Sequence, residues 1–218
     1  MDEGIRMCIK YGARVGRRMV FWLLASLMGA MGAAAVAAPM PKIPFSRPLK
    51  ADMWQQATKL PGIDTGPASA PVREVIFFDA NCPMCARQWG LLRPYLDHVH
   101  IHWVPVAYFD GSGPGSSSAR RAASILDSLH PATSLRINEQ GYHTSAQRGA
   151  FPALGSIGPE MMDTLDRNMV VMKKLHGFGT PTTLIALEPG HRYVVASGVI
   201  TGKSLADLMA WLQSAPAH

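Results

Sequence analysis

The sequence contains few cysteines, only three in 218 residues. Cys8 lies in the N-terminal region, and the other two, Cys82 and Cys85, are separated by Pro83 and Met84. A disulfide across so short a gap constrains almost nothing in the unfolded chain, so this pair cannot serve as a staple for the fold. In an oxidising compartment, such a pair is most simply a redox couple.

The sequence also lacks a marked excess of positive charge beyond its first 38 residues. The formal charge of the whole chain is +6, from 21 basic and 15 acidic residues. Residues 1–38 hold five of the basic and two of the acidic residues, which leaves +3 for the remainder. The high isoelectric point therefore owes much to the N-terminal region, and we expect no nucleic-acid partner.

Charged residues are absent from 19–38. Five basic residues precede this apolar run: Arg6, Lys10, Arg14, Arg17 and Arg18. A basic region, an apolar region and the small-x-small site at 35–37 are typical of a secretory signal peptide, so we expect residues 1–38 to be removed near Ala37 or Ala38. An uncleaved membrane anchor is the alternative, because the run is about long enough to span a bilayer.

Proline and glycine punctuate the remaining chain. Residues 39–71 are rich in proline and predict an extended lead-in with a short helix at 54–60, followed by a compact domain over 72–218. Within that domain the apolar pattern predicts strands at 75–78, 99–106, 182–187 and 193–197, and helices at 86–96, 116–129, 159–176 and 204–213. A loose Gly- and Pro-containing stretch separates the two middle helices. This order is the thioredoxin topology, an α/β fold, with a helical insertion at about 111–178 between its second and third strands.

Cys82 and Cys85 stand where a buried strand meets a helix. Thiol–disulfide exchange needs a thiolate that attacks and a second thiol that resolves the mixed disulfide. The first sulfur of a Cys-x-x-Cys pair at a helix start lies over free backbone N–H groups and the positive end of the helix dipole, which stabilise its thiolate. We therefore predict that Cys82 attacks and Cys85 resolves. A buried structural pair is the alternative.

Two further positions are candidates for the same site. Thr180 and Pro181 precede a predicted strand, where thioredoxin-like folds place a cis-proline loop that faces the cysteines. We predict a cis bond between them and a substrate-binding role for both, since the backbone before such a proline can pair with an extended substrate. Asp79, three residues before Cys82, is either a buried proton carrier or an ordinary carboxylate at a strand end, and the residues leave both open.

A possible metal site is the main competing pattern. Cys82 and Cys85 with His98 and His102 match the spacing of a zinc finger. The histidines fall in a predicted strand, however, where about 13 Å separates their positions, too far for one metal ion. We expect His98, His100 and His102 on the solvated face of a half-buried strand, and no metal or organic cofactor.

Taken as a set, several motifs resemble the periplasmic thiol:disulfide interchange proteins of the DsbC/DsbG type. The set consists of Phe78-Asp79, the Cys-Pro-x-Cys form at 82–85, Trp89, Arg93-Pro94, residues 122–126 and Thr180-Pro181. The resemblance implies a periplasmic protein that a membrane thiol relay of the DsbD type keeps reduced, and that acts on exported proteins with cysteines.

The predicted function is a periplasmic thiol–disulfide oxidoreductase that reduces or isomerises disulfides through a mixed disulfide at Cys82. The alternative is a redox-inert binding module, namely a holdase or an assembly factor of an envelope complex. Proteins of the DsbC/DsbG type are dimers built on an N-terminal dimerisation domain, for which residues 39–71 offer too little apolar surface. We therefore expect a monomer.

Overall fold

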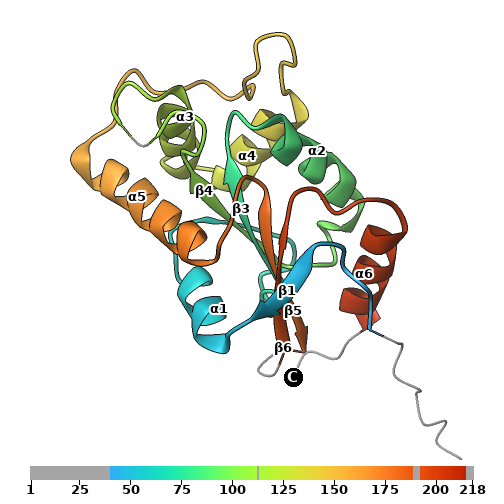
Figure 1. The fold of residues 1–218 in the computed structure, drawn as a ribbon. Coiled ribbons are helices and arrows are strands. Elements are labelled where there is room, and N and C mark those ends of the chain that lie inside the picture. Colours follow the sequence, from blue (N-terminus) through green and yellow to red (C-terminus); the bar gives the residue numbers. More distant parts are fainter. Residues whose placement is uncertain (1–39, 112, 189–191, 215–218) are drawn as a thin grey trace, which may run out of the picture. The chain divides into compact units, whose positions relative to one another are not determined.

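The computed structural model describes residues 40–111, 113–188 and 192–214, so the predicted signal peptide at 1–38 lies outside the described residues. A six-stranded sheet in the order β1-β6-β5-β3-β4-β2 forms the centre of the fold (Figure 1). Its strands are β1 Ser46–Leu49, β2 Ile63–Thr65, β3 Glu74–Asp79, β4 Ile101–Val106, β5 Thr182–Glu188 and β6 Arg192–Ser197. β3 and β4 are parallel, and the other neighbouring strands are antiparallel.

The helices connect and cover these strands. They are α1 Ala51–Ala57, α2 Pro83–Leu92, α3 Ser117–Leu126, α4 Pro131–Gln140, α5 Pro159–Lys174 and α6 Gly202–Ser214, with a short 3₁₀ helix η1 at Arg93–Tyr95. The order β3-α2-β4, a helical block, then β5-β6-α6 is the predicted one, and the insertion lies between β4 and β5. Within the described ranges, no helix combines the length and the apolar character that crossing a membrane requires.

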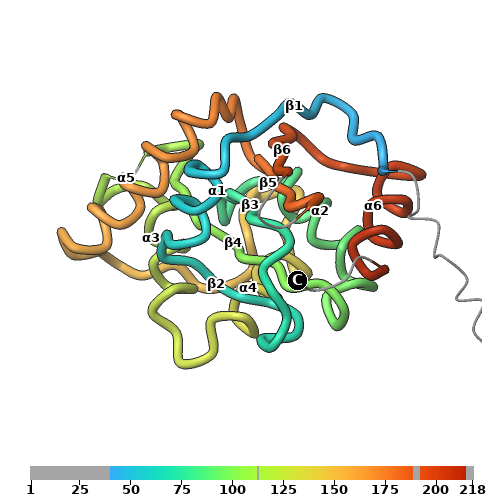
Figure 2. The backbone as a smooth tube through the Cα atoms, turned by 90° about the horizontal axis from the view of Figure 1, so that it is seen from below, coloured from blue at the N-terminus to red at the C-terminus, as the bar shows by residue number. Residues whose placement is uncertain are grey.

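The core forms on both faces of β3, which is buried along its whole length as its apolar run predicts. Ile76 and Phe78 pack with residues of α2, α4 and α6. Val75 and Phe77 alternate with them and pack with residues of α1 and α5 on the other face. Figure 2 shows α6 and α1 on opposite sides of the central strands. β3 is therefore held between two helical layers, which fixes the position of the segment that follows it.

The described part of the predicted lead-in, residues 40–71, is not separate from the domain, contrary to the sequence interpretation. β1 pairs with β6 and β2 pairs with β4, so this segment supplies both outer strands of the sheet. The prolines suggested an extended linker, but an outer strand tolerates proline because one of its sides needs no N–H donor. Pro48 lies within β1 for this reason. The predicted short helix exists as α1, three residues earlier than expected.

Trp54 of α1 joins this segment to the core, where its ring stacks on Tyr193 with 5.0 Å between ring centres. Because Trp54 is buried, we expect Trp54→Ala to lower the free energy of unfolding by about 3 kcal/mol. Phe45, which is 88% exposed, provides the control. Phe45→Ala should change the free energy of unfolding by less than about 0.5 kcal/mol. Urea unfolding of the purified chain measures both, and equal midpoints for the two variants would contradict an integral role for this segment.

Two of the three histidines in and before β4 are not on a solvated face, which corrects a second expectation. β2 pairs with β4, and the segment around β2 encloses His100 and His102, which are buried, whereas His98 is exposed. His102 Nδ1 and His100 Nε2 lie 2.8 and 3.2 Å from the same Asp64 oxygen. The other ring nitrogens contact the carbonyl oxygens of Leu60 and Ala70. The histidines therefore fasten the β2 segment to the sheet.

The helical block contains one helix that the sequence analysis did not predict. α4 occupies part of the stretch that was interpreted as loose. Pro131 suggested a break, but it stands in the first turn of the helix, where its missing N–H has no intrahelical partner to lose. Leu135 of α4 is fully buried and belongs to the same apolar cluster as both cysteines of the pair. The insertion thus forms part of the wall around the predicted site.

Candidate redox site

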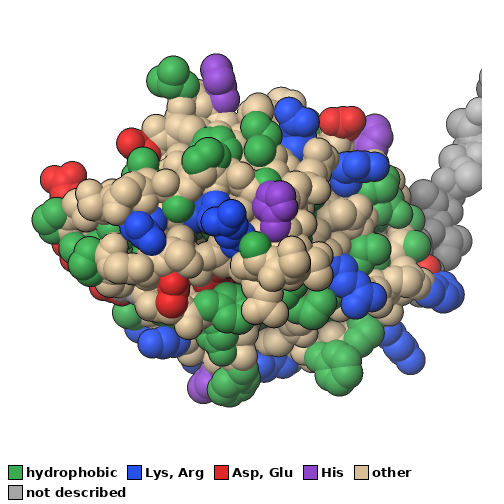
Figure 3. All heavy atoms as spheres, turned by 90° about the horizontal axis from the view of Figure 1, so that it is seen from above, with side chains coloured by type: hydrophobic (Ala, Val, Ile, Leu, Met, Phe, Trp, Pro, Cys, Tyr) green, Lys and Arg blue, Asp and Glu red, His purple; other side chains and the backbone are tan. Residues whose placement is uncertain are grey.

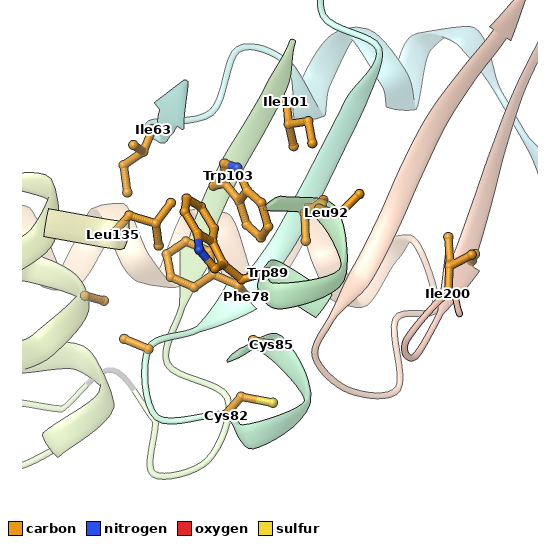
Figure 4. Close-up of a cluster of buried hydrophobic side chains, with 14 of the residues drawn as sticks. Ile63, Phe78, Cys82, Cys85, Trp89, Leu92, Ile101, Trp103, Leu135 and Ile200 are labelled. Atoms are coloured by element: carbon orange, nitrogen blue, oxygen red, sulfur yellow. The ribbon is translucent and has the colours of Figure 1, made fainter. Parts of the chain in front are cut away.

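The cysteine pair lies where β3 passes into α2. Cys82 is the N-cap residue of α2, with extended backbone angles (φ −84°, ψ 119°), and Pro83 occupies the first turn. The Cys85 N–H donates to the Cys82 carbonyl oxygen at 3.1 Å, which places the two residues one turn apart. Both are buried free thiols. Figure 4 shows them at one end of the cluster that contains Phe78 and Trp89.

The thiol of Cys82 ionises more readily than a free cysteine. Its pKa is lowered to about 7, chiefly because the Cys85 thiol donates a hydrogen bond to its sulfur. Burial opposes this change, while the Thr180 side chain and the N–H groups of Cys85 and Met84 support it. The sequence predicts the backbone contribution of the helix start, but the neighbouring thiol is the larger cause.

The thiol of Cys85 behaves in the opposite way. Burial raises its pKa well above the usual range, and the hydrogen bond to Cys82 and the negative charge of Cys82 raise it further. One sulfur is therefore available as a thiolate near neutral pH while the other keeps its proton. This asymmetry is what an attacking and a resolving thiol require.

The asymmetry predicts how the pair reacts with iodoacetamide at different pH values. Below pH 7 the Cys82 thiolate gains a proton and becomes less reactive. The alkylation rate of the wild-type chain should therefore rise with pH and reach half of its maximum near pH 7. In Cys85→Ala the midpoint should move upward, because the thiol that donates to Cys82 is gone. Mass spectrometry of quenched samples gives the rates. A wild-type midpoint near 8.5, the value of a free thiol, would refute the assignment.

The loop before β5 faces Cys82. The Thr180–Pro181 bond is cis, as the sequence predicts. Cys82 Sγ donates to the Thr180 carbonyl oxygen at 3.3 Å. The Thr180 hydroxyl is buried and has no other hydrogen-bond partner among the described residues, so a thiolate at Cys82 offers it an acceptor. Residues almost one hundred positions apart thus meet at one sulfur.

Asp79 lies beside the pair, but four donors occupy its two oxygens. Oδ1 accepts from the Asn81 N–H and the Ser118 hydroxyl, each at 2.8 Å. Oδ2 accepts from the N–H groups of Tyr108 at 2.7 Å and Phe109 at 3.1 Å. Burial raises the pKa of Asp79, and these hydrogen bonds oppose that rise. Asp79 therefore ties β3 to the loop after β4 and to α3, and its role as proton carrier stays a prediction.

Asn81, the residue immediately before Cys82, is hydrogen-bonded to residues of the insertion. Its Nδ2 donates to the Ser118 hydroxyl at 3.3 Å, and its Oδ1 accepts from Arg121 Nε at 2.8 Å and from the Gly149 N–H at 3.3 Å. The Tyr142 hydroxyl donates to the Asn81 carbonyl oxygen at 3.1 Å. Sequence reasoning missed this network because its members lie 37 to 68 residues apart along the chain.

Glu139 of α4 is a second buried carboxyl near the cysteines. Asn138 Nδ2 donates to Glu139 Oε1 and to the Ala80 carbonyl oxygen, both at 2.9 Å, and so holds α4 against the segment before Cys82. Burial raises the pKa of Glu139 well above its usual range, the Asn138 hydrogen bond opposes this, and negative charge on Cys82 adds to it. Buried titratable groups that influence one another in this way are typical of functional sites.

Two curated proteins are similar to this chain in sequence, although no protein-family model matches it. The thiol:disulfide interchange protein DsbG of Pseudomonas aeruginosa is 27% identical over 161 residues, which cover 73% of this chain and 59% of that protein. DsbG of Escherichia coli is 28% identical over 136 residues, which cover 62% and 51%. The chain is DsbG-like. It spans between half and three-fifths of the length of these relatives.

The solved structures support the fold of this DsbG-like chain. A periplasmic thioredoxin-like protein from Salmonella enterica serovar Typhimurium superposes with a TM-score of 0.56 at 22% identity, covering 77% of this chain and all of that one. The fold is therefore thioredoxin-like, with the helical insertion as predicted. Cys82, Cys85, Thr180, Pro181 and Asp79 lie together around the C-terminal end of β3, of which Asp79 is the last residue. The roles assigned to them stay predictions.

Proposed function

We propose that the chain is a thiol–disulfide oxidoreductase that reduces or isomerises disulfides in exported proteins. The observation that carries this proposal is the pair of unequal thiols at the start of α2, one with a pKa of about 7 and the other with a pKa raised well above its usual range. The similarity to DsbG supports a thiol–disulfide interchange function. The periplasmic origin of the structural neighbour supports a periplasmic location, in line with the predicted signal peptide.

The proposed reaction has two steps. The Cys82 thiolate attacks one sulfur of a client disulfide, a Cys82–client bond forms, and the second client sulfur leaves with the electron pair and takes a proton from water. Cys85 then loses its proton and attacks Cys82 Sγ, which releases the first client sulfur as a thiolate. The client is reduced and the pair is oxidised. If a thiol of the client attacks instead of Cys85, the client disulfide is isomerised and the pair stays reduced.

Reduction of insulin by dithiothreitol tests the proposal. We expect the wild-type chain to accelerate the reduction and Cys82→Ser to leave it at the uncatalysed rate, because a hydroxyl is not ionised at neutral pH. Refolding of scrambled ribonuclease by the reduced chain tests isomerisation in the same way.

A redox-inert binding module predicts a different result. Such a module would suppress the aggregation of an unfolded client equally well as the wild-type chain and as Cys82→Ser. Neither of the two would catalyse insulin reduction. An uncatalysed rate for the wild-type chain would therefore refute the oxidoreductase proposal.

A further inference from the structure

Three arginines of the insertion lie near Cys82, and we call them the arginine cluster. They are Arg120 and Arg121 of α3 and Arg148 in the loop between α4 and α5. Arg121 Nε and the N–H group of Gly149, the residue after Arg148, both donate to Asn81 Oδ1, at 2.8 and 3.3 Å. Because Asn81 immediately precedes Cys82, this shared acceptor ties the cluster to the segment that carries the reactive thiol.

Hydrogen bonds hold the cluster in place. Arg121 Nη1 donates to the Phe151 carbonyl oxygen, and Arg120 donates to two carbonyl oxygens at 3.2 and 3.3 Å. The backbone of Arg148 pairs with that of His143 across a short antiparallel bridge. The cluster is thus a preorganised group of charges, which lowers the entropic cost of binding.

No carboxylate of the described residues balances these three charges. Within the described ranges, the ion pairs involve Asp64 of β2 and Asp207 of α6, and none involves a residue of the cluster. Arg121 is only 6% exposed. Burial lowers its pKa, and the positive charges of Arg148 and Arg120 lower it further. Since a buried charge in a protein is normally paired with an opposite one, an anion bound at the cluster relieves this repulsion.

A hollow of about 260 Å³ leads from the surroundings of Cys82 towards the cluster. Its walls include Pro83, which follows Cys82, and Gln147, which precedes Arg148. Asp110 also lines the hollow, but N–H groups at the start of α3 donate to its carboxylate, and the positive end of that helix balances its charge. A client segment bonded to Cys82 therefore has space to extend towards Arg148.

The charge of this end of the molecule favours acidic clients. Figure 3 shows the end at which α2 begins, with Lys and Arg side chains spread across the face and most Asp and Glu side chains near its edge. Opposite charges steer a client to such a face and raise its rate of association. Arginine in particular binds carboxylates through paired N–H groups. A basic client segment is repelled by the same charges.

We propose that the arginine cluster binds carboxylate side chains of client segments, so that the chain prefers cysteines with acidic residues nearby in the sequence. This inference rests on the proposed function and names its substrate class. In the complex the client cysteine is bonded to Cys82, its neighbours occupy the hollow, and a Glu or Asp side chain a few residues away contacts Arg148.

Three peptides of equal length test this inference. They differ only in the residues near the single cysteine, which are Glu in one peptide, Gln in the second and Lys in the third. Each peptide carries 2-thiopyridine, an uncharged leaving group, as a mixed disulfide. Attack by the Cys82 thiolate on the peptide sulfur forms a Cys82–peptide bond, and thiopyridine leaves with the electron pair and takes a proton from water, which changes the absorbance.

We expect the wild-type chain to react with the Glu peptide about tenfold faster than with the Gln peptide at low ionic strength, and with the Lys peptide most slowly. At about 1 M salt, where the screening length falls to about 3 Å, the preference for Glu should shrink below about twofold.

Variants of exposed arginines locate the effect. Arg148→Gln should reduce the preference for Glu below about threefold, whereas Arg148→Lys keeps the charge and should keep most of the preference. Arg192 is exposed and begins β6, at the end of the sheet far from Cys82. Arg192→Gln therefore removes the same charge elsewhere and should keep the full preference. Because both side chains are exposed, the variants should retain the wild-type unfolding midpoint.

Three results would overturn the inference. The first is a wild-type preference for Glu below twofold at low ionic strength, or one that Arg148→Gln leaves intact. The second is an equal loss of rate with the Glu and Gln peptides in Arg148→Gln, because Arg148 would then act on Cys82 and not on the client. The third is a rate with the thiopyridine adduct of glutathione that matches the Glu peptide and falls equally in Arg148→Gln, since a small anion would then occupy the cluster. If Cys82 reacts with none of these disulfides, the proposed function fails instead.

Discussion

Replacement of Cys85 by Ala is expected to turn the chain into a trap for its clients. In the wild-type chain Cys85 lies one helical turn from Cys82, so in the proposed reaction it attacks the mixed disulfide within the same molecule. Groups held in this way act at effective concentrations far above those of free thiols. Without Cys85, release depends on an external thiol, and we expect the mixed disulfide to persist about a thousandfold longer at millimolar thiol concentrations.

Cys85→Ser is the matched variant for this experiment. Serine keeps a hydrogen-bond donor but cannot attack a disulfide, so it should trap clients while perturbing the pKa of Cys82 less than alanine does. Non-reducing gels of each variant after incubation with oxidised insulin show the covalent complex. The rate of complex formation is recorded separately from the rate of release, because the pKa of Cys82 governs its attack on the client and can differ between the variants. Equal release rates for the wild-type chain and both variants would mean that Cys85 does not resolve the complex.

The sequence predicts the centre of the fold and the position of the cysteine pair at a helix start because both depend on local signals. The apolar run of β3, the Cys-x-x-Cys pair and Pro83 at the helix start lie within a dozen residues of one another. Thr180 and Pro181 follow from the topology, which places the loop before β5 opposite that helix start. Each of these positions can therefore be predicted from local sequence and topology, without knowledge of distant contacts.

The parts that the sequence analysis missed depend on pairing over long distances. Residues 39–71 have a composition typical of a linker, and only pairing with β6 and β4 turns parts of them into strands. The same pairing buries His100 and His102, which a half-buried strand would have left exposed. Glu139 escaped notice because α4 begins with a proline and its polar residues gave no clear period. Composition therefore misleads where tertiary contacts decide the outcome.

Glu74, at the start of β3, is expected to make the stability of the chain depend on pH. It is fully buried, and one of its carboxyl oxygens has no hydrogen-bond partner among the described residues. Burial raises its pKa from 4.5 to about 8. Between these values the folded chain keeps the proton and the unfolded chain does not. Stability is therefore highest below pH 4.5 as far as this group is concerned, and it falls as the pH rises towards 8.

The size of this effect is large for a single residue. Each unit of difference in pKa corresponds to about 1.4 kcal/mol, so the folded state loses about 4 to 5 kcal/mol across the window from 4.5 to 8. Glu74→Gln has a side chain of the same shape that does not ionise. We expect the variant to match the wild-type stability near pH 4.5 and to exceed it by several kcal/mol at pH 8.

Urea unfolding at half-unit steps of pH from 4.5 to 8.5 measures this difference directly. Glu188 lies in the neighbouring strand β5 and is exposed, so Glu188→Gln controls for the loss of one negative charge. Its unfolding free energy should run parallel to that of the wild-type chain at every pH, whereas the curve of Glu74→Gln should diverge upward. If the Glu74→Gln and wild-type curves stay parallel, the Glu74 carboxyl is ionised in the folded chain, and a partner within the core must stabilise its charge.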